Sequence, residues 1–593
     1  MRTRAALAAL LLASCLDVPE GPAPECRATT ECDSANGEVC EEGVCWGNPP
    51  EGMFAAVVVP PSDRKDLVPK EIRELQITES GWIAGLALER PITVSGAVEA
   101  TCPGTGACDR AIEATITVTR ASHFAGGPGF KTVIETTVST DGATYELRVP
   151  PPRADATDEE RRELPYTVTV VPKGRGDSEP TSPTAAMRVP PMWFQIAPTE
   201  DTTRAIQLGG TALGAIDGQV LSSAFAGLAK YRVVALGRWE PGGPLTEVST
   251  VAYTQADGKF TLYLSDGLAE DVEVVARPYG GGIQPTLRMA GVSKDGATQL
   301  ALVEPIGLGG TEDIGLELRG KNGDGEIGPV RGATVRLSAQ VGAPTPGATR
   351  ATVTFERTTD DSGRVKVPVL GGSAINDAYV LDVIPPASAA VGAITSVPLG
   401  PMTSRQTILL PPRVAIRGTV VGAWGEPLEN VPVTARPALE FLWSLEGSAQ
   451  TFLSSIPVAT TSTTSRGEFV LWVDPLVASV GGLYDVVIEP PTTNKYPLRA
   501  PTHVVTDIAI PDRSGPPLLE IVLPDAAFVH GQVTDPSNKN VEGAEVKVFK
   551  IIPSLTSICT SVPHAPSTCP VPASLQGRGA SDLGGVVRVT LPR

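Results

Sequence analysis

Five short stretches of the chain carry apolar residues at every second position, and each stretch follows a turn. In one of them Val365, Val367 and Val369 follow the turn Asp-Asp-Ser-Gly. A period of two with one apolar face is typical of half-buried antiparallel β-strands. The corresponding positions of the other four stretches are Tyr145, Leu147 and Val149; Phe260, Leu262 and Leu264; Phe469, Leu471 and Val473; and Val587, Val589 and Leu591.

These stretches belong to a longer repeat. In degenerate form, the repeat begins with a strand ending in Gly-x-Val, passes through a variable turn to a strand of the type Gly-Ala-x-Val, and reaches the alternating strand after a longer gap. The first glycines lie roughly 100 to 120 residues apart, the size of one β-sandwich rather than of a solenoid unit. They are Gly96, Gly218, Gly320, Gly418 and Gly531.

The succession Gly-x-Val, Gly-Ala-x-Val, Asp-x-x-Gly-x-Phe and Tyr-Asp-Val resembles the carboxypeptidase regulatory-like domain, a transthyretin-like β-sandwich. The resemblance covers most of the chain and matches best in the second and fourth repeats. It implies accessory or stalk modules of bacterial surface proteins and enzymes. We therefore expect an all-β protein of tandem transthyretin- or Ig-like β-sandwich repeats after a small disulfide-rich knot.

The repeats predict the domain organisation. We expect a lipoprotein signal peptide at 1–14, a tether at 15–25, the disulfide-rich knot at 26–48, a partial β segment at 49–90, and sandwiches at 91–209, 210–308, 309–411, 412–523 and 524–593. The fifth sandwich is expected to be incomplete, because the sequence stops after its alternating strand. Conversely, residues 53–96 resemble the closing strands of a unit without a beginning.

An open sandwich edge exposes backbone donors and acceptors and accepts another strand. Head-to-tail completion, in which the N-terminal strands of one chain finish the fifth unit of the next, is therefore one hypothesis. A misplaced unit boundary and a truncated product are the alternatives.

The N-terminus carries a targeting signal. Arg2 and Arg4 precede an apolar run that is too short for a permanent membrane-spanning helix. The segment Leu12-Ala13-Ser14-Cys15 resembles the lipobox of bacterial lipoproteins, whose cysteine is acylated. An ordinary signal with a chance cysteine is the alternative. We expect secretion and lipidation of Cys15, which anchors the protein to the cell envelope at the outer membrane or cell surface.

The cysteine count suits an oxidising compartment, since nine cysteines leave an even eight once Cys15 is acylated. The spacing of the first four fits a zinc knuckle poorly, and we expect two disulfides, of open connectivity, in a knot too short to build its own core. Each of the two later pairs is expected to staple one loop. The candidates are Cys26, Cys32, Cys40, Cys45, Cys102, Cys108, Cys559 and Cys569.

Charge and motifs exclude several functions. The formal net charge of −18 argues against nucleic acid as a partner, because polyanion binding draws on clustered Lys and Arg. None of the four histidines falls in a His-x-x-Glu or His-Glu-x-x-His motif, and no serine-hydrolase elbow, Walker loop or dinucleotide fingerprint occurs. We expect no catalysis and no cofactor.

Two low-specificity binding sites remain. Trp424, in a turn, and Trp472 and Tyr263, on the outward phase of strands, are candidate ligand-binding aromatics, although a lone exposed aromatic more often covers a neighbouring module.

The segment GKNGDGEIG offers Asn322, Asp324 and Glu326 as calcium ligands. Gly320 and Arg331 occupy the positions where a helix-loop-helix site needs acidic ligands. A turn between repeat strands is the favoured reading, with weak calcium binding as the alternative.

These observations favour a lipid-anchored surface scaffold, or an adhesion or interaction protein, without catalytic activity. Its expected partners are the membrane, through the lipid anchor, and an extracellular protein or glycan. The alternative is a carbohydrate-binding accessory protein of a surface degradation system.

Overall fold

The computed structural model describes residues 26–593 except for 42, 104–105, 109–110, 125–128, 140, 153–164, 177–184, 210–213, 242, 280–282, 295–297, 322–324, 342–347, 376–378, 400–404, 439–440, 442–455, 457, 476–482, 491–499, 511–517, 552–570 and 572. Over the described residues the protein is almost entirely β-structure, arranged as β-sandwiches after a short disulfide-rich segment. The predicted fold class is therefore confirmed.

The second sandwich illustrates the plan of the repeat. Its strands are β15 (Ala215–Leu221), β16 (Tyr231–Gly237), β17 (Thr246–Glu247), β18 (Ala252–Tyr253), β19 (Lys259–Tyr263), β20 (Val272–Pro278), β21 (Thr286–Val292) and β22 (Thr298–Val303). In one sheet, β15 pairs antiparallel with β19 and parallel with β22. In the other sheet, β16 pairs with β17, β18 and β20, and β20 pairs with β21. In every complete unit, the first strand pairs parallel with the last strand.

Alternation along these strands builds the core between the two sheets. Ile216 and Val220 of β15 and Leu262 of β19 are fully buried, and they face Val274 and Ala276 of β20 in one hydrophobic cluster. Each fully buried aliphatic side chain contributes roughly 1.5–3 kcal/mol. The period-two pattern is thus the direct cause of the two-layer arrangement.

The turn before each alternating strand requires glycine. Gly258 has φ +71°, and a Cβ on it would lie 2.2 Å from the carbonyl oxygen of Val220. Val220 donates its N–H to the carbonyl of Gly258 at 2.8 Å, which fixes the turn against the first strand. The same arrangement recurs in three further units, at Gly363 with Leu318, Gly467 with Val420, and Gly585 with Val533.

The first, third and fourth sandwiches follow the same plan. The first contains β6 (Ile92–Cys102), β7 (Gly106–Ala107), β8 (Ile112–Arg120), β9 (Phe130–Val138), β10 (Ala143–Val149), β11 (Tyr166–Pro172), β12 (Met192–Ile196), β13 (Thr202–Thr203) and β14 (Ile206–Leu208). The third contains β23 (Thr311–Lys321), β24 (Ile327–Pro329), β25 (Thr334–Val341), β26 (Arg350–Thr358), β27 (Arg364–Leu370), β28 (Val380–Ile384), β29 (Ile394–Pro398) and β30 (Arg405–Leu409). The fourth contains β31 (Val414–Val421), β32 (Pro432–Pro437), β33 (Ala459–Ser462), β34 (Glu468–Val473), β35 (Leu483–Ile488), β36 (His503–Ala509) and β37 (Leu519–Val522).

The second and third sandwiches share a sheet. β21 pairs antiparallel with β26, so that five strands of the second sandwich and four of the third become one nine-stranded sheet. Their cores also form one continuous cluster, which runs from Ile216 to Leu410. These two sandwiches therefore behave as one continuous body.

The fifth sandwich is completed within the chain. Its C-terminal strands are β38 (Ala526–Gln532), β39 (Glu545–Ile551), β40 (Ala573–Ala580) and β41 (Val586–Pro592), and the N-terminal segment adds β3 (Phe54–Val59), β4 (Lys70–Leu75) and β5 (Trp82–Ile83). The sheets have the orders β4-β3-β39-β40 and β41-β38-β5. The expectation that this sandwich is incomplete is thus wrong, and so is the hypothesis that a second chain supplies its missing strands.

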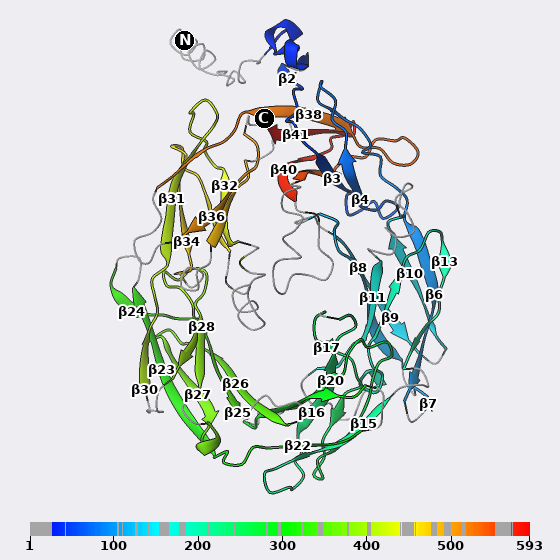
Figure 1. The fold of residues 1–593 in the computed structure, drawn as a ribbon, viewed down its shortest axis with the longest axis vertical. Helices are drawn as coiled ribbons and strands as arrows, with labels where there is room; N and C mark the ends of the chain where they lie inside the picture. Colours follow the sequence, from blue (N-terminus) through cyan, green and yellow to red (C-terminus); the bar gives the residue numbers. More distant parts are fainter. Residues whose placement is uncertain are drawn as a thin grey trace, which may run out of the picture.

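Because the first and last strand groups share a sandwich, the five units form a closed ring (Figure 1). The blue N-terminal strands lie beside the orange and red C-terminal strands. The sheets that contain β8 and β11, β16 and β20, β25 and β26, and β32 and β36 lie on the inner side of the ring, and those that contain β6, β15, β23 and β31 lie on the outer side.

Direct contacts fix neighbouring sandwiches. Between the first and second, Arg175 lies 3.5 Å from Glu247, which also lies 2.9 Å from Arg232 of its own sandwich. Burial lowers the pKa of Arg175 to about 10, partly offset by Glu247. Between the third and fourth, the N–H of Ala393 donates to Asp474 at 2.7 Å. The joints of the ring are therefore packed contacts rather than bare linkers.

Candidate functional site: the ring closure and its disulfide knot

The closure of the ring joins parts of the chain that lie far apart in the sequence. β3 pairs antiparallel with β39, from Phe54 opposite Lys550 to Val59 opposite Glu545. In the second sheet β5 runs parallel to β38, with Ile83 opposite Gly531. These strands take the places that β20, β21 and β22 occupy in the second sandwich. One buried cluster joins the two ends of the chain and includes Phe54, Ala56, Val58, Leu86, Leu88, Val529, Val533, Val546, Val548, Val587, Val589 and Leu591.

The repeat glycine packs in the same way in the second, fourth and fifth units. A Cβ on Gly218 would lie 2.9 Å from the carbonyl oxygen of Leu300, and one on Gly418 would lie 2.6 Å from that of Leu519. Both oxygens belong to the final, parallel strand of their own unit. In the fifth unit the corresponding oxygen, 2.9 Å from a Cβ on Gly531, is that of Ile83. The N-terminal segment therefore reproduces the contact of a native last strand.

The closure also joins the first sandwich to the fifth. Phe124 stacks on Phe549 with ring centroids 6.1 Å apart, and both side chains are buried. Phe124 forms a parallel bridge with Val571. Ser122 donates its hydroxyl to Glu71 of β4 at 2.9 Å. These contacts lie on the other face of the β4-β3-β39-β40 sheet from the sandwich core.

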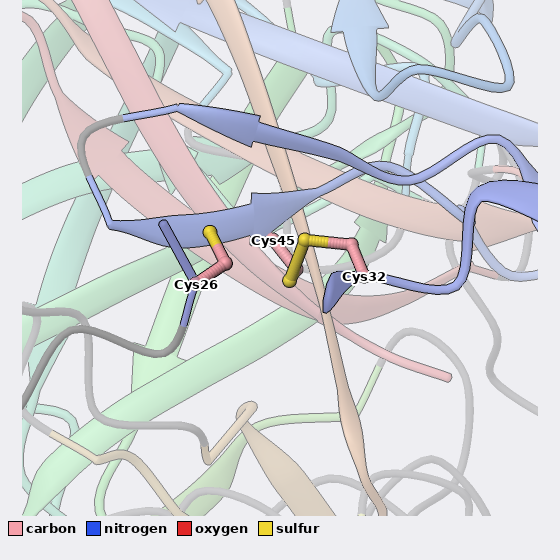
Figure 2. A group of neighbouring side chains, drawn as sticks. All are labelled: Cys26, Cys32 and Cys45. Atoms are coloured by element: carbon pink, nitrogen blue, oxygen red, sulfur yellow. A yellow bond between two sulfur atoms is a disulfide. The ribbon is translucent and has the colours of Figure 1, made fainter. Parts of the chain in front are cut away.

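Two disulfides form the knot at residues 26–48. Cys26 bonds to Cys40 and Cys32 to Cys45, which settles the connectivity that spacing left open. The knot contains η1 (Thr29–Glu31), η2 (Ser34–Asn36) and the hairpin of β1 (Val39–Glu41) and β2 (Val44–Trp46). The sulfurs of Cys26, Cys32 and Cys45 lie within 4.8 Å of one another (Figure 2). Since all three are disulfide-bonded, none is a thiolate that would bind a metal.

The knot is docked on the fifth sandwich through Trp46. This side chain is 3% exposed, and its ring centroid lies 5.9 Å from that of Phe528 in β38. The indole N–H donates to the carbonyl of Glu41 at 3.0 Å, which satisfies the polar end of the buried ring. Gly47 donates its N–H to the carbonyl of Phe528 at 2.9 Å. The knot thus contributes a hydrophobic anchor and a backbone hydrogen bond to the closure.

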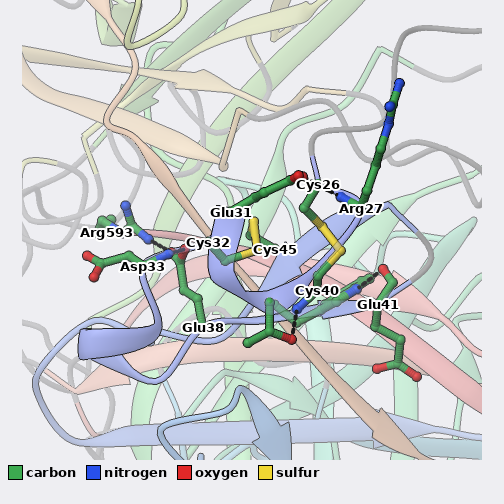
Figure 3. Close-up of a disulfide and its surroundings, with 12 residues drawn as sticks. Cys26, Arg27, Glu31, Cys32, Asp33, Glu38, Cys40, Glu41, Cys45 and Arg593 are labelled. Carbon is green, nitrogen blue, oxygen red and sulfur yellow. Dashed lines mark hydrogen bonds and ion pairs between the residues drawn. A yellow bond between two sulfur atoms is a disulfide. The ribbon is translucent and has the colours of Figure 1, made fainter.

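Arg593 connects the knot to the end of the fifth sandwich. Its guanidinium pairs with Glu38 of the knot (Figure 3) and with Asp525, which it reaches at 3.1 Å. Glu38 is 8% exposed and also accepts the N–H of Asp33 at 2.9 Å. A nearly buried carboxylate therefore meets a cation from the opposite end of the described chain.

His530 of β38 lies between two tryptophans. Its ring centroid is 5.1 Å from that of Trp46 and 5.2 Å from that of Trp82, both edge-on. Burial lowers the pKa of His530, while Glu41, 3.8 Å from its Nε2, acts in the opposite direction. Nδ1 is buried and has no hydrogen-bond partner among the described residues. The neutral imidazole is therefore the form that suits the closed ring.

The remaining candidate residues lie apart from this closure. Trp424, in the turn between β31 and β32, is 74% exposed, and Trp472 of β34 is 53% exposed. Both belong to the fourth sandwich, whereas Tyr263 of β19 is half-buried in the second. The structure does not unite the three in one site, and ligand binding by them stays a prediction.

Of the calcium candidates, Glu326 directly precedes β24 in the hairpin of β23 and β24, where Lys321 pairs with Ile327. Glu326 is exposed, and Asn322 and Asp324 lie outside the described residues. Weak calcium binding at this loop stays a prediction.

Among the other cysteines, Cys102 and Cys108 form the expected loop disulfide. Cys15, Cys559 and Cys569 lie outside the described residues. Lipidation of Cys15 and the last disulfide therefore stay predictions. No helix of the described part of the chain is both long and apolar enough to cross a membrane.

No protein-family model matches the chain, and no curated protein sequence matches it. Similar solved structures include a streptococcal ancillary pilin, which is 10% identical, covers 52% of this chain and 99% of its own, and has a TM-score of 0.17. The Bacillus anthracis TIE protein is 9% identical, covers 72% of this chain and 73% of its own, and has a TM-score of 0.14. BcpA, the major pilin subunit of Bacillus cereus, is 11% identical, covers 53% and 99%, and has a TM-score of 0.13. Likeness at these TM-scores assigns no function to this chain.

Proposed function

We propose that this protein is a lipid-anchored scaffold of the bacterial cell envelope, without catalysis, that presents a ring of carboxypeptidase regulatory-like sandwiches to an extracellular protein or glycan. The observation that carries the proposal is the closure of the ring by β3, β4 and β5. The closure pairs the edges that the fifth sandwich would otherwise expose, and paired edges protect a β-protein from unwanted strand addition. The result is a large fixed surface, which suits a scaffold.

The compartment is supported independently. Three disulfides among the described residues fit an oxidising environment. The knot begins at Cys26, directly after the expected tether, and is bonded to the fifth sandwich. An acyl group on Cys15 would therefore hold the ring at the membrane through a tether of about ten residues, and two or three acyl chains are needed for stable anchoring.

Metabolic labelling tests the anchor. Full-length protein expressed in a bacterium with an alkyne fatty acid is expected to incorporate label and to enter the detergent phase. Cys15→Ser is expected to abolish both without changing secretion. Label in Cys15→Ser, or an unlabelled secreted wild type, would contradict the anchor.

Capture from envelope extracts tests the scaffold role. We expect the intact ring to retain a defined protein or glycan, and Gly531→Val, which loosens the closure without removing a surface side chain, to retain less of it. Gly328→Ala is the matched control, because a Cβ there meets no atom within 4 Å. Equal retention of the partner by the wild type, Gly531→Val and Gly328→Ala, together with binding of the partner to one isolated sandwich, would contradict a role for the ring.

The alternative is a carbohydrate-binding accessory protein of a surface degradation system, which the exposure of Trp424 and Trp472 favours. Aromatic faces at the surface are suitable platforms for sugar rings. A glycan array distinguishes the two functions: glycan signal that is lost in Trp424→Ala or Trp472→Ala but kept in Phe225→Ala would replace the scaffold proposal. Phe225 is the control because it is a 73% exposed aromatic in a turn of the second sandwich.

A further inference from the structure

An open pocket of about 430 Å³ lies where the second and third sandwiches share their sheet. Arg288 of β21 and Arg350 of β26 line it and are direct register partners across this joint. Their strand neighbours Leu287 and Ala351 are fully buried in the core. The two arginines therefore project from the opposite face, which belongs to the inner side of the ring (Figure 1).

The charges in this pocket are unbalanced. Among the described residues, Glu273 is the one acidic residue of the pocket wall and lies 3.4 Å from Arg288, and Arg350 forms no ion pair. Like charges directly opposite each other across a strand pair destabilise a sheet. The chain as a whole is acidic, with a net charge of −18, so its average composition does not explain this local excess of positive charge.

Both guanidinium groups also have an unused donor. The Nε atoms of Arg288 and Arg350 are buried and make no hydrogen bond with any described residue. Buried donors are nearly always paired with protein, water or ligand acceptors. The same wall carries the hydroxyls of Ser338, Thr352 and Thr354, which are further donors.

We propose that this pocket binds an oxyanion, namely the carboxylate, sulfate or phosphate group of a ligand that reaches the inner side of the ring. Guanidinium groups bind such oxygens through paired, charge-assisted hydrogen bonds. The anion would sit between Arg288 and Arg350 and neutralise their repulsion, while the hydroxyls of the third sandwich complete its contacts. Glu273 competes for Arg288 and limits the affinity.

Titration calorimetry of the full chain with sodium sulfate, phosphate or acetate, at constant ionic strength in chloride, tests the site. We expect saturable binding that weakens at least tenfold in Arg350→Gln and in Arg288→Gln. Arg336→Gln is the control: it removes the same charge from the third-sandwich part of the same sheet, where Arg336 pairs with Glu356 at 3.0 Å. Unchanged binding in Arg350→Gln, equal weakening in Arg336→Gln, or no binding of any of the three anions would overturn the proposal.

Glu273→Gln gives a test of opposite sign. Removal of the competing carboxylate frees Arg288, so we expect this variant to bind the anion more tightly than the wild type, and equal or weaker binding would count against the site. Without anion, Arg350→Gln is expected to melt no lower than the wild type, because it removes a like-charge contact; this separates lost binding from lost folding. A preference for acetate assigns a carboxylate ligand, and a preference for sulfate or phosphate assigns a tetrahedral one.

Discussion

The carbonyl oxygen of Ile83 lies 2.9 Å from the position that a Cβ on Gly531 would occupy. The two residues are register partners in the parallel pair of β5 and β38, although one lies near each end of the chain. Only a hydrogen atom at Gly531 allows this approach. The contact therefore makes the closure of the ring sensitive to a single methyl group.

Gly531→Val is expected to lower the free energy of unfolding of the fifth sandwich by about 1–3 kcal/mol, because overpacking forces β5 away from β38. Thermal denaturation, with hydrogen exchange of residues 526–532, measures the loss. Gly328→Ala should leave both unchanged. Equal stability of the two variants would show that β5 is not held in this register.

Intramolecular closure predicts a covalent cross-link within one chain. Val59 and Glu545 are register partners in β3 and β39. The double variant Val59→Cys/Glu545→Cys is expected to form a disulfide that leaves the protein monomeric on a non-reducing gel and in light scattering. A disulfide-linked dimer would instead support strand exchange between chains.

Trp46→Ala is expected to release the knot. Removal of a buried aromatic side chain costs about 3–5 kcal/mol, and here the loss falls on the contact with Phe528. We expect faster proteolysis within residues 26–48 and faster hydrogen exchange in β38. Trp424→Ala is the control with the same chemical change at a 74% exposed site, and its stability should stay within about 0.5 kcal/mol of the wild type.

The closure is expected to weaken in acid through His530. Burial lowers its folded-state pKa below the unfolded value of 6.5, so the unfolded chain binds more protons between these two pKa values. The stabilisation that His530 contributes is therefore complete above about pH 6.5 and decreases as pH falls from there to the folded pKa. Melting temperatures of wild type and His530→Gln across pH 5 to 8 measure this; parallel profiles would assign the acid sensitivity to other groups.

The Cys32–Cys45 bridge is expected to stabilise the knot by about 3 kcal/mol, the loop-closure value for a bridge of this span. Cys32→Ser/Cys45→Ser should therefore increase protease sensitivity at residues 26–48 while the sandwiches keep their melting transition. A simultaneous loss of the main transition would mean that the ring does not close without the knot.

Local patterns predicted the sandwiches well. The glycine before each alternating strand, such as Gly258, can be recognised as a turn residue from the sequence alone. Its positive φ and its closeness to Val220 explain why no side chain is tolerated there. Period-two alternation likewise identified β19, β27, β34 and β41. These features depend on residues close together in the chain.

Strand partners that lie far away in the sequence were not predictable in the same way. A continuous apolar run marks residues 54–59 as a strand, but nothing local shows that β39 is its partner, because backbone pairing has the same chemistry along any strand. The chemistry of Arg288 and Arg350 was missed for the same reason: the two residues meet only through the pairing of β21 with β26. The repeat itself was the signal that could have predicted the pairing. The fifth unit lacks its last three strands, and the N-terminal segment contains only strands of that kind, so the two are complementary.

The shared sandwich also decides how the molecule carries mechanical load. A pulling force applied at residue 26 is transmitted through the knot to the fifth sandwich. From there the force is shared by two parts of the ring, one that leads through β3 to the first sandwich and one that leads through β38 to the fourth. Tandem modules in an open string bear the full force one after another. In the ring each of these two parts carries only a share of the force, so the chain resists extension until the β3–β39 ladder itself is sheared.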